Sequence, residues 1–146
     1  MLVKKLEALT QNIKPTDHMV LFYEAQENKR KILFNFIADG LDKNKGCLYI
    51  CSDEMPEQIR RGMETFGINV EEEEKAGKLM ILSCDGLYIE KGRAEPLRII
   101  TRLNEIYEQF KSKGFGMRAT GEASCFFKHN QLRELLRYEY ALHRAL

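Results

Sequence analysis

The chain has 146 residues, of which 44% are hydrophobic and 31% charged, and its 23 Lys plus Arg nearly balance its 22 Asp plus Glu. That length suits a single domain, and so small a net charge argues against a general nucleic-acid binder, whose affinity needs a clear excess of positive charge. No apolar run approaches the roughly 18 residues of a membrane span, and the first residues lack the apolar core of a signal peptide, so we expect a cytoplasmic protein that enters no membrane.

The cysteines suit the same compartment. Cys47, Cys51, Cys84 and Cys125 form no Cys-x-x-Cys pair. Four cysteines in a chain of this length do not make a disulfide-dense framework. We therefore expect reduced thiols.

Hydrophobic periodicity and turn residues predict helices and strands in alternation. The first helix is amphipathic, with apolar residues at Leu2, Leu6, Leu9 and Ile13, so it either packs on the domain or pairs with a second copy. In chain order, the expected elements are a helix over 2–13, a strand over 19–23, a helix over 29–41, a strand over 47–51, a helix over 56–66, a short acidic helix over 71–76, a strand over 79–83, a helix from 96 that ends at Gly114, a strand over 115–120 and a helix over 130–146.

Short strands that alternate with helices imply crossover connections and a parallel sheet. The runs 19–23 and 47–51 are apolar throughout, as expected of strands that are covered on both faces. We therefore expect an α/β protein, a three-layer α/β/α domain with a mainly parallel central sheet. A single domain should span residues 1–146, with the amphipathic helix at 1–14 and the α/β core at 17–146.

Polar residues gather where the expected strands end. Open parallel sheets bind their ligands outside the carboxyl ends of the strands, so these residues form a candidate pocket. The alternative is that they are ordinary polar residues at the start of loops. The set comprises Tyr23, Glu24, Cys51, Ser52, Asp53, Glu54, Cys84, Asp85, Thr120, Gly121 and Glu122.

Arg118 falls within an expected central strand, where a buried guanidinium needs a partner because an unpaired buried charge costs several kcal/mol. Glu122 and Glu139, the latter on the apolar face of the last helix, are the candidate partners. Such a pair is either a structural tie between helix and sheet or the polar floor of a ligand site.

Three further features admit two readings each. His18, just before the first expected strand, is a possible proton donor, metal ligand or pH switch, or a histidine bonded to neighbouring backbone. Cys51, Cys84 and Cys125 could bind zinc with a histidine, but their spacing matches no zinc signature and strand cysteines are usually small buried hydrophobes. The basic segment 29–31 could attract an anion at a helix start, or be a solvated basic turn.

Part of the chain resembles the KaiC-type branch of the RecA-like ATPases. The residues that carry this resemblance are Phe36–Leu41, Cys47–Glu54, Ile59–Arg60, Phe66–Ile68 and Gly77–Leu79. Such an ATPase needs G-x-x-x-x-G-K-[ST] between its first strand and first helix, to hold phosphates. Here that junction, residues 23–31, has no glycine and carries two carboxylates, Glu24 and Glu27, and Arg118 stands where a later strand would carry a metal-binding aspartate. The resemblance thus implies a RecA-like scaffold without its nucleotide site.

The chain is also similar to the MEDS family, the methanogen/methylotroph sensory domain. The blocks that carry this similarity are Asp17–Glu24, Phe36–Leu41, Cys47–Glu54, Arg118–Glu122 and Leu135–Glu139. It implies a small-molecule-sensing module for hydrocarbon derivatives such as one-carbon compounds, often joined to a DNA-binding or histidine-kinase output module.

From these observations we expect a non-catalytic sensory domain, a homodimer without cofactor or metal, which binds a small organic ligand and no nucleic acid directly. The expected ligand-binding residues are His18, Tyr23, Glu24, Cys51, Asp53, Arg118, Glu122 and Glu139. Two alternatives stay open: an atypical nucleotide-binding enzyme of RecA-like fold, and a protein-interaction module whose pocket is vestigial.

Overall fold

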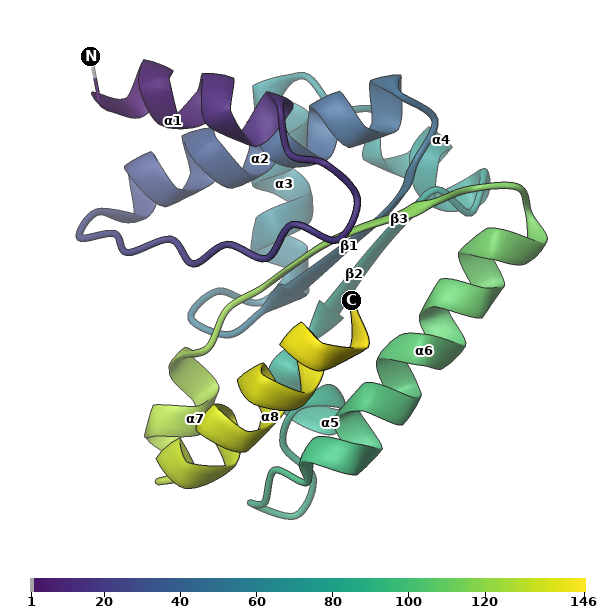
Figure 1. The fold of residues 1–146 in the computed structure, drawn as a ribbon. Coiled ribbons are helices and arrows are strands. Elements are labelled where there is room, and N and C mark those ends of the chain that lie inside the picture. The colour runs from purple at the N-terminus through teal and green to yellow at the C-terminus, as the bar shows by residue number, and fades with distance from the viewer. Residues whose placement is uncertain (1) are drawn as a thin grey trace.

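The fold is that of a computed structural model, which describes residues 2–146, without the side chains of Leu2, Val3 and Glu7 (Figure 1). Its elements are α1 (Leu2–Gln11), α2 (Gln26–Asp42), β1 (Gly46–Cys51), α3 (Pro56–Phe66), α4 (Val70–Lys75), β2 (Leu79–Ser83), α5 (Cys84–Leu87), α6 (Pro96–Ser112), β3 (Met117–Gly121), α7 (Ser124–Lys128) and α8 (Leu132–Ala145).

The sheet has three parallel strands in the order β2-β1-β3. Every residue of the central strand β1 is buried. Cys47 is in register with Leu79 on one side and with Arg118 on the other, so the carboxyl ends of all three strands lie at one edge of the sheet.

Helices cover both faces of this sheet, which confirms the expected three-layer α/β/α architecture (Figure 1). Side chains of β1 alternate between the faces, as the pleat of a strand requires. Cys47, Tyr49 and Cys51 pack with residues of α2 and α3, whereas Leu48 and Ile50 pack with residues of α6 and α8. The two resulting cores hold the helices on either side of β1.

The expected first strand over 19–23 is wrong. This stretch belongs to an extended segment, residues 12–25, that we call the strap, and it has no ladder hydrogen bonds. Val20 is 68% exposed and Phe22 is 90% exposed. An apolar run favours a strand only where a sheet edge pairs with it, and this segment is instead tied at two side chains, His18 and Tyr23.

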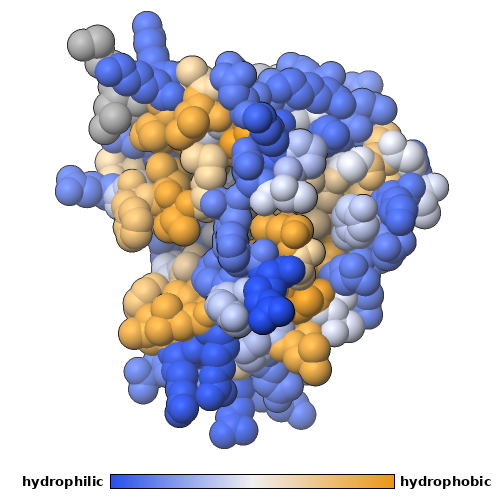
Figure 2. All heavy atoms as spheres, in the orientation of Figure 1, coloured by the Kyte–Doolittle hydropathy of each residue, from blue (hydrophilic) through white to orange (hydrophobic). Residues whose placement is uncertain are grey.

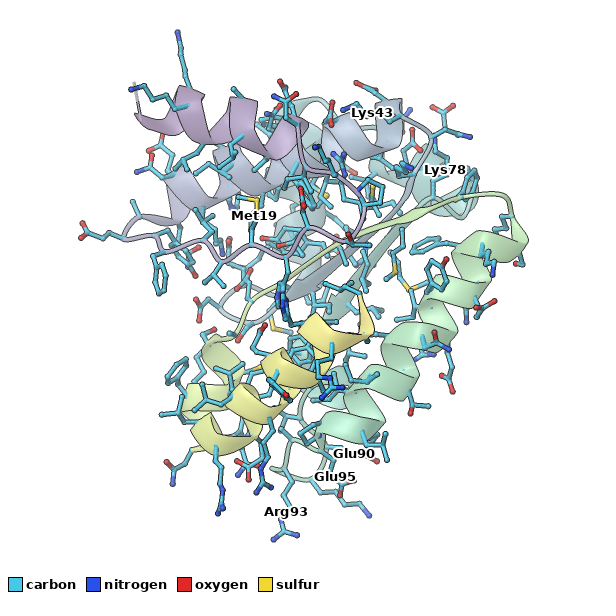
Figure 3. All side chains as sticks on the ribbon, in the orientation of Figure 1. Met19, Lys43, Lys78, Glu90, Arg93 and Glu95 are labelled. Atoms are coloured by element: carbon cyan, nitrogen blue, oxygen red, sulfur yellow. The ribbon has the colours of Figure 1, made fainter. Side chains whose placement is uncertain are left out.

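The strap connects α1 to α2 and crosses the face of the molecule that Figure 1 presents, below α2 in that view and in front of the strands. Figure 2 shows apolar side chains, in orange, at the surface of this face among polar ones. Figure 3 labels Met19, on the strap, which is also exposed. Met19, Val20 and Phe22 of the strap therefore present their apolar side chains to solvent.

The structure differs from the expected elements in two further respects, the position of β3 and two short helices. β3, expected to be central and covered on both faces, is an edge strand in which Ala119 and Gly121 are exposed. The short helices α5 and α7 were not predicted, because four or five residues are too few to show a helical period.

The amphipathic first helix packs on the domain, beside α2 (Figure 1). Lys43 at the end of α2 donates a hydrogen bond to the Gln11 carbonyl at 2.9 Å, and Ile13 packs against the core on the α2 side. Leu9 is nevertheless exposed, so pairing with a second copy stays a prediction. Within residues 2–146, no helix has the length and apolar content to cross a membrane.

Candidate functional site

A buried carboxylate lies at the carboxyl ends of the strands and receives four hydrogen bonds. Glu122 Oε1 accepts from Lys29 Nζ at 3.1 Å and from the Tyr49 hydroxyl at 3.2 Å. Glu122 Oε2 accepts from the backbone N–H of Ser52 at 3.2 Å and from that of Asp53 at 3.1 Å. Two donors on each oxygen, one of them an ammonium, make this a strong carboxylate-binding arrangement.

Three segments bring these groups together: β1 with the turn that follows it, α2, and the end of β3. β1 ends at Cys51, so the next two amides, of Ser52 and Asp53, point past the end of the sheet. Successive backbone N–H groups in such a turn form a concavity that suits an anion. Lys29 comes from the first turn of α2, and Glu122 follows β3 directly, where its own N–H donates to the Ile50 carbonyl at 2.9 Å.

Lys29 is fully buried and therefore needs its charge neutralised inside the protein. Besides Glu122 it contacts Glu54, whose Oε1 lies 3.3 Å from Nζ. Arg30 also donates to Glu54, through Nε at 3.2 Å and through Nη2. Burial raises the pKa of Glu54, but the hydrogen bonds from Arg30 and Lys29 outweigh it and hold that pKa below its usual value. The cluster balances two cations against two carboxylates.

The outer side of this cluster is covered by the strap. The Tyr23 ring lies over Lys29 Nζ, 5.4 Å from the ring centroid, and the Tyr23 hydroxyl donates to Asp53 Oδ2 at 3.1 Å. Burial and the hydrogen bond to Asp53 raise the pKa of Tyr23 to about 12. Asp53 also accepts from Ser124 and Lys128, both at 2.9 Å, and the bond from Lys128 is the main reason why the pKa of Asp53 is lowered.

Lys29 has a more central place in the structure than its position in a basic run predicts. The basic segment 29–31 is not a solvated turn, because Lys29 has 0% exposure and only Lys31, paired with Glu27 at 3.3 Å, is exposed. If the lysine of the phosphate-binding motif G-x-x-x-x-G-K-[ST] is set on Lys29, the eight positions of the motif cover residues 23–30. Its two glycines then fall on Tyr23 and Asn28.

The carboxylates nearest to Lys29 in the sequence are not the ones that contact it. Glu24 and Glu27, close in sequence, are both exposed. Glu54 and Glu122, which lie 25 and 93 residues away, supply the contacts instead. Ion pairs between residues so far apart in the chain depend on the tertiary fold, so the local sequence does not predict them.

The structure brings together a subset of the expected site residues. Tyr23, Asp53 and Glu122 form the cluster described above. Cys51 lies next to it at the end of β1, where it is fully buried and its thiol donates to the Leu82 carbonyl at 3.3 Å. Burial raises the pKa of this thiol to about 11. Cys51 therefore belongs to the wall of the site as a neutral group.

His18 and Glu139 form a second, separate pair. His18 Nε2 lies 2.9 Å from Glu139 Oε2, and the imidazole stacks on His143 at 6.0 Å between ring centroids. These contacts tie the strap to α8 and include no member of the Lys29 cluster.

Arg118 pairs with neither Glu122 nor Glu139, which corrects the expected pairing. Its Nη1 donates to Asp39 Oδ2 at 2.8 Å and to the Phe36 carbonyl at 2.9 Å, both in α2. Arg118 precedes Glu122 by four residues along the strand direction, a separation of about 13 Å. It therefore lies toward the opposite end of the sheet from the strand-end cluster.

All four thiols are free and buried. Cys84 and Cys125 lie against one another, and the hydrogen bond from Cys125 lowers the pKa of Cys84. Among the residues described, no three His, Cys, Asp or Glu side chains are arranged to hold a metal ion. The cysteines at the strand ends thus line the interior beside the cluster.

A groove of about 550 Å³ lies elsewhere, between α2 and α3. Phe34 and Phe66 supply its apolar surface, while Arg30 and Arg61 supply positive charge. Gly62 leaves space for Arg30, because a Cβ there would come within 2.6 Å of Arg30 Nη1. Arg30 thus connects this groove to the buried cluster through Glu54.

Comparison with known proteins agrees with a sensory module. A UPF0273 protein of Thermotoga maritima is 35% identical over 80 residues, which cover 52% of this chain and 33% of that relative. The alignment thus spans only a third of the relative's length. A family model described as "MEthanogen/methylotroph, DcmR Sensory domain" matches residues 17–146, nearly the whole chain. On the strength of that match, the chain belongs to the MEDS family of sensory domains.

Proposed function

We propose that this domain is a non-catalytic sensor that binds a small organic ligand at the strand-end cluster, under the strap. The observation that carries the proposal is the convergence of polar groups from α2, β1, β3 and the strap on one point at the carboxyl ends of the strands. Ligand sites of open parallel sheets lie at this edge.

The strap gives the proposed site a means of opening and closing. Its middle has no ladder hydrogen bonds, and Met19, Val20 and Phe22 are exposed. Ordering these side chains over a bound hydrocarbon derivative, such as a one-carbon compound, would bury apolar surface. Such a ligand would favour the closed arrangement by its differential affinity for the two states.

The strap also connects the proposed site to the surface. Tyr23 ties it to Asp53 at the site, and His18 ties it to Glu139 of α8. A change in the strap would reach α8 by this route. We propose that α1 and α8 pass the signal on, across a homodimer and to a DNA-binding or histidine-kinase output module of a cytoplasmic system.

One observation favours a nucleotide as the ligand: Lys29 lies buried in the first turn of α2, and the lysine of the phosphate-binding motif also stands at the start of a helix. Lys29 already forms ion pairs with Glu54 and Glu122, and the negative charge of these carboxylates would repel an approaching phosphate. We therefore place this second candidate behind the small organic ligand.

Amide NMR titration of the chain tests the proposal, with methanol, methylamine, trimethylamine and ATP–Mg²⁺ as separate probes. We expect a one-carbon probe to shift the amide signals of Ser52, Asp53 and the strap, and Tyr23→Phe to weaken that response. Tyr107→Phe, an exposed tyrosine on α6, is the matched control and should leave it unchanged. The proposal would be overturned if only ATP–Mg²⁺ shifted these signals, or if no probe shifted them.

A further inference from the structure

We propose that the donors around Glu122 form an exchangeable carboxylate site, in which a small carboxylate from solution takes the place of the Glu122 side chain. This inference rests on the proposed function and specifies one ligand class for it. It starts from the four hydrogen bonds that the Glu122 carboxylate receives from Lys29, Tyr49, Ser52 and Asp53.

The donors are held by elements that do not depend on Glu122. Tyr49 is fully buried within the central strand, and the Ser52 and Asp53 amides follow the end of the same strand. Lys29 is fixed by Glu54 as well as by Glu122. The site would therefore keep its shape when the Glu122 side chain leaves, which is the condition for preorganised binding.

The Glu122 side chain, by contrast, comes from the end of the edge strand β3, directly after the exposed Gly121. The Glu122 N–H donates to the Ile50 carbonyl, and α7 beyond it is held by Ser124, whose hydroxyl donates to Ser52 Oγ at 2.7 Å. The proposed exchange therefore moves the Glu122 side chain and leaves the backbone of the edge strand and of the central strand in place.

Charge balance makes the exchange feasible for an anion and not for a neutral molecule. An unpaired buried lysine is costly, so Glu122 cannot leave unless another negative group arrives. A ligand carboxylate restores the balance of two cations and two carboxylates around Lys29, Arg30 and Glu54. The released Glu122 side chain is then hydrated, and Lys29 stays paired.

The number and placement of donors indicate the ligand class. Two hydrogen bonds reach each oxygen, and the Tyr23 ring covers Lys29 from the strap side, so the site suits a planar carboxylate with a small substituent, such as formate or acetate. Inorganic phosphate shares the anionic oxygens but has four of them. Because Glu122 competes from within the same chain at high effective concentration, the wild-type protein should bind such anions weakly.

The test measures formate, acetate and phosphate binding by isothermal titration and by the amide shifts of Ser52 and Asp53, against chloride at the same ionic strength. We expect Glu122→Ala to bind formate or acetate at least about tenfold more tightly than the wild-type protein, because the internal competitor is gone. Glu122→Gln, which keeps the shape of the side chain but loses its charge, should show a smaller gain. Glu105→Ala, whose exposed carboxylate pairs with Arg102 on α6 away from the cluster and the strap, is the matched control and should bind as the wild type does.

Equal affinity of Glu122→Gln and the wild-type protein for formate and acetate would overturn the inference, even if Glu122→Ala does not fold. So would a gain for phosphate alone, or a gain that chloride reproduces. The outcome is independent of the one-carbon titration: a response to methanol or methylamine with none to carboxylates would keep the sensory proposal and remove this one.

Discussion

Two cations, the buried Lys29 and the partly buried Arg118, join α2 to the end strand β3 at opposite ends of the sheet. Arg118 reaches from β3 to Asp39 and the Phe36 carbonyl in the second half of α2, next to Lys43, which Figure 3 labels and which also binds Asp39 at 2.9 Å. Lys29 reaches from the first turn of α2 to Glu122 just beyond β3. Both contacts are ion pairs between the same two elements.

The difference lies in what else converges on each pair. Around Arg118 the partners all come from one helix, and the Phe36 ring lies 4.8 Å from the guanidinium. Around Lys29 the partners come from β1, β3 and the strap, and the acceptor carboxylate uses both oxygens. The first arrangement serves to brace helix against strand. The second gathers donors at one point, as a binding site does, so convergence rather than burial of charge distinguishes the candidate site.

Removal of the Lys29 charge should lower the free energy of unfolding more than the other changes considered below. Lys29→Met leaves Glu122 and Glu54 in the interior with reduced compensation, and breaking a buried pair in this way costs about 3–5 kcal/mol. Urea denaturation measures the loss of stability. Lys31→Met, two residues on and exposed, is the control and should cost about 0.5 kcal/mol or less, as a surface pair does. Equal losses for the two variants would mean that the Lys29 cluster contributes no more than a surface pair.

Removal of the Arg118 side chain should cost less. Arg118→Met removes one hydrogen bond to the Asp39 carboxylate and one to the Phe36 carbonyl, but Asp39 keeps Lys43 and is in part exposed, so we expect a loss of about 1–3 kcal/mol. The same variant should bind formate as the wild type does, because Arg118 lies toward the other end of the sheet. If Arg118→Met lost as much stability as Lys29→Met, or bound formate differently from the wild type, the Arg118–Asp39 pair would not be a purely structural contact.

The smallest expected effect is that of Glu54→Gln on how the free energy of unfolding depends on pH in acid. The pKa of Glu54 lies below its ordinary value of 4.5 in the folded state, so its ion pairs stabilise the fold above that pH. This contribution is lost as the pH falls through the folded pKa, where the folded state must take up a proton. In Glu54→Gln, unfolding free energy measured by urea titration should therefore fall less steeply below pH 4.5 than in the wild type.

Glu57→Gln is the matched control for that experiment. Glu57 is exposed and lies 3.8 Å from Arg60, so the acid slope should equal that of the wild type. Asp39 and Asp53 also have lowered pKa values, which leaves a residual slope in Glu54→Gln. A slope in Glu54→Gln identical to the wild type would mean that Glu54 takes no part in the acid response.

The sequence by itself determined the layered α/β architecture, because burial patterns and turn residues are local. β1 is apolar at every position and proves to be buried throughout. Pro56 begins α3 as expected, and Gly67 ends it with φ at 115°, a conformation that glycine adopts without strain. The expected helix from 96 is α6, which ends at Ser112, two residues before Gly114. The strand-end location of Asp53 and Glu122 also followed from the order of the elements, whereas Tyr23 reaches the same place from the strap.

Tertiary structure decided the rest, because pairing depends on segments far apart in the chain. The apolar composition of residues 19–23 indicated a strand, but without a partner edge the segment became the strap. Lys29 reads as one member of a basic run, and only the fold brings it under Glu122 and Glu54. Arg118 needed a partner on any reading, and the approach of α2 to β3 made that partner Asp39. Local patterns fix which faces are buried, whereas the contacts between those faces fix which charges meet.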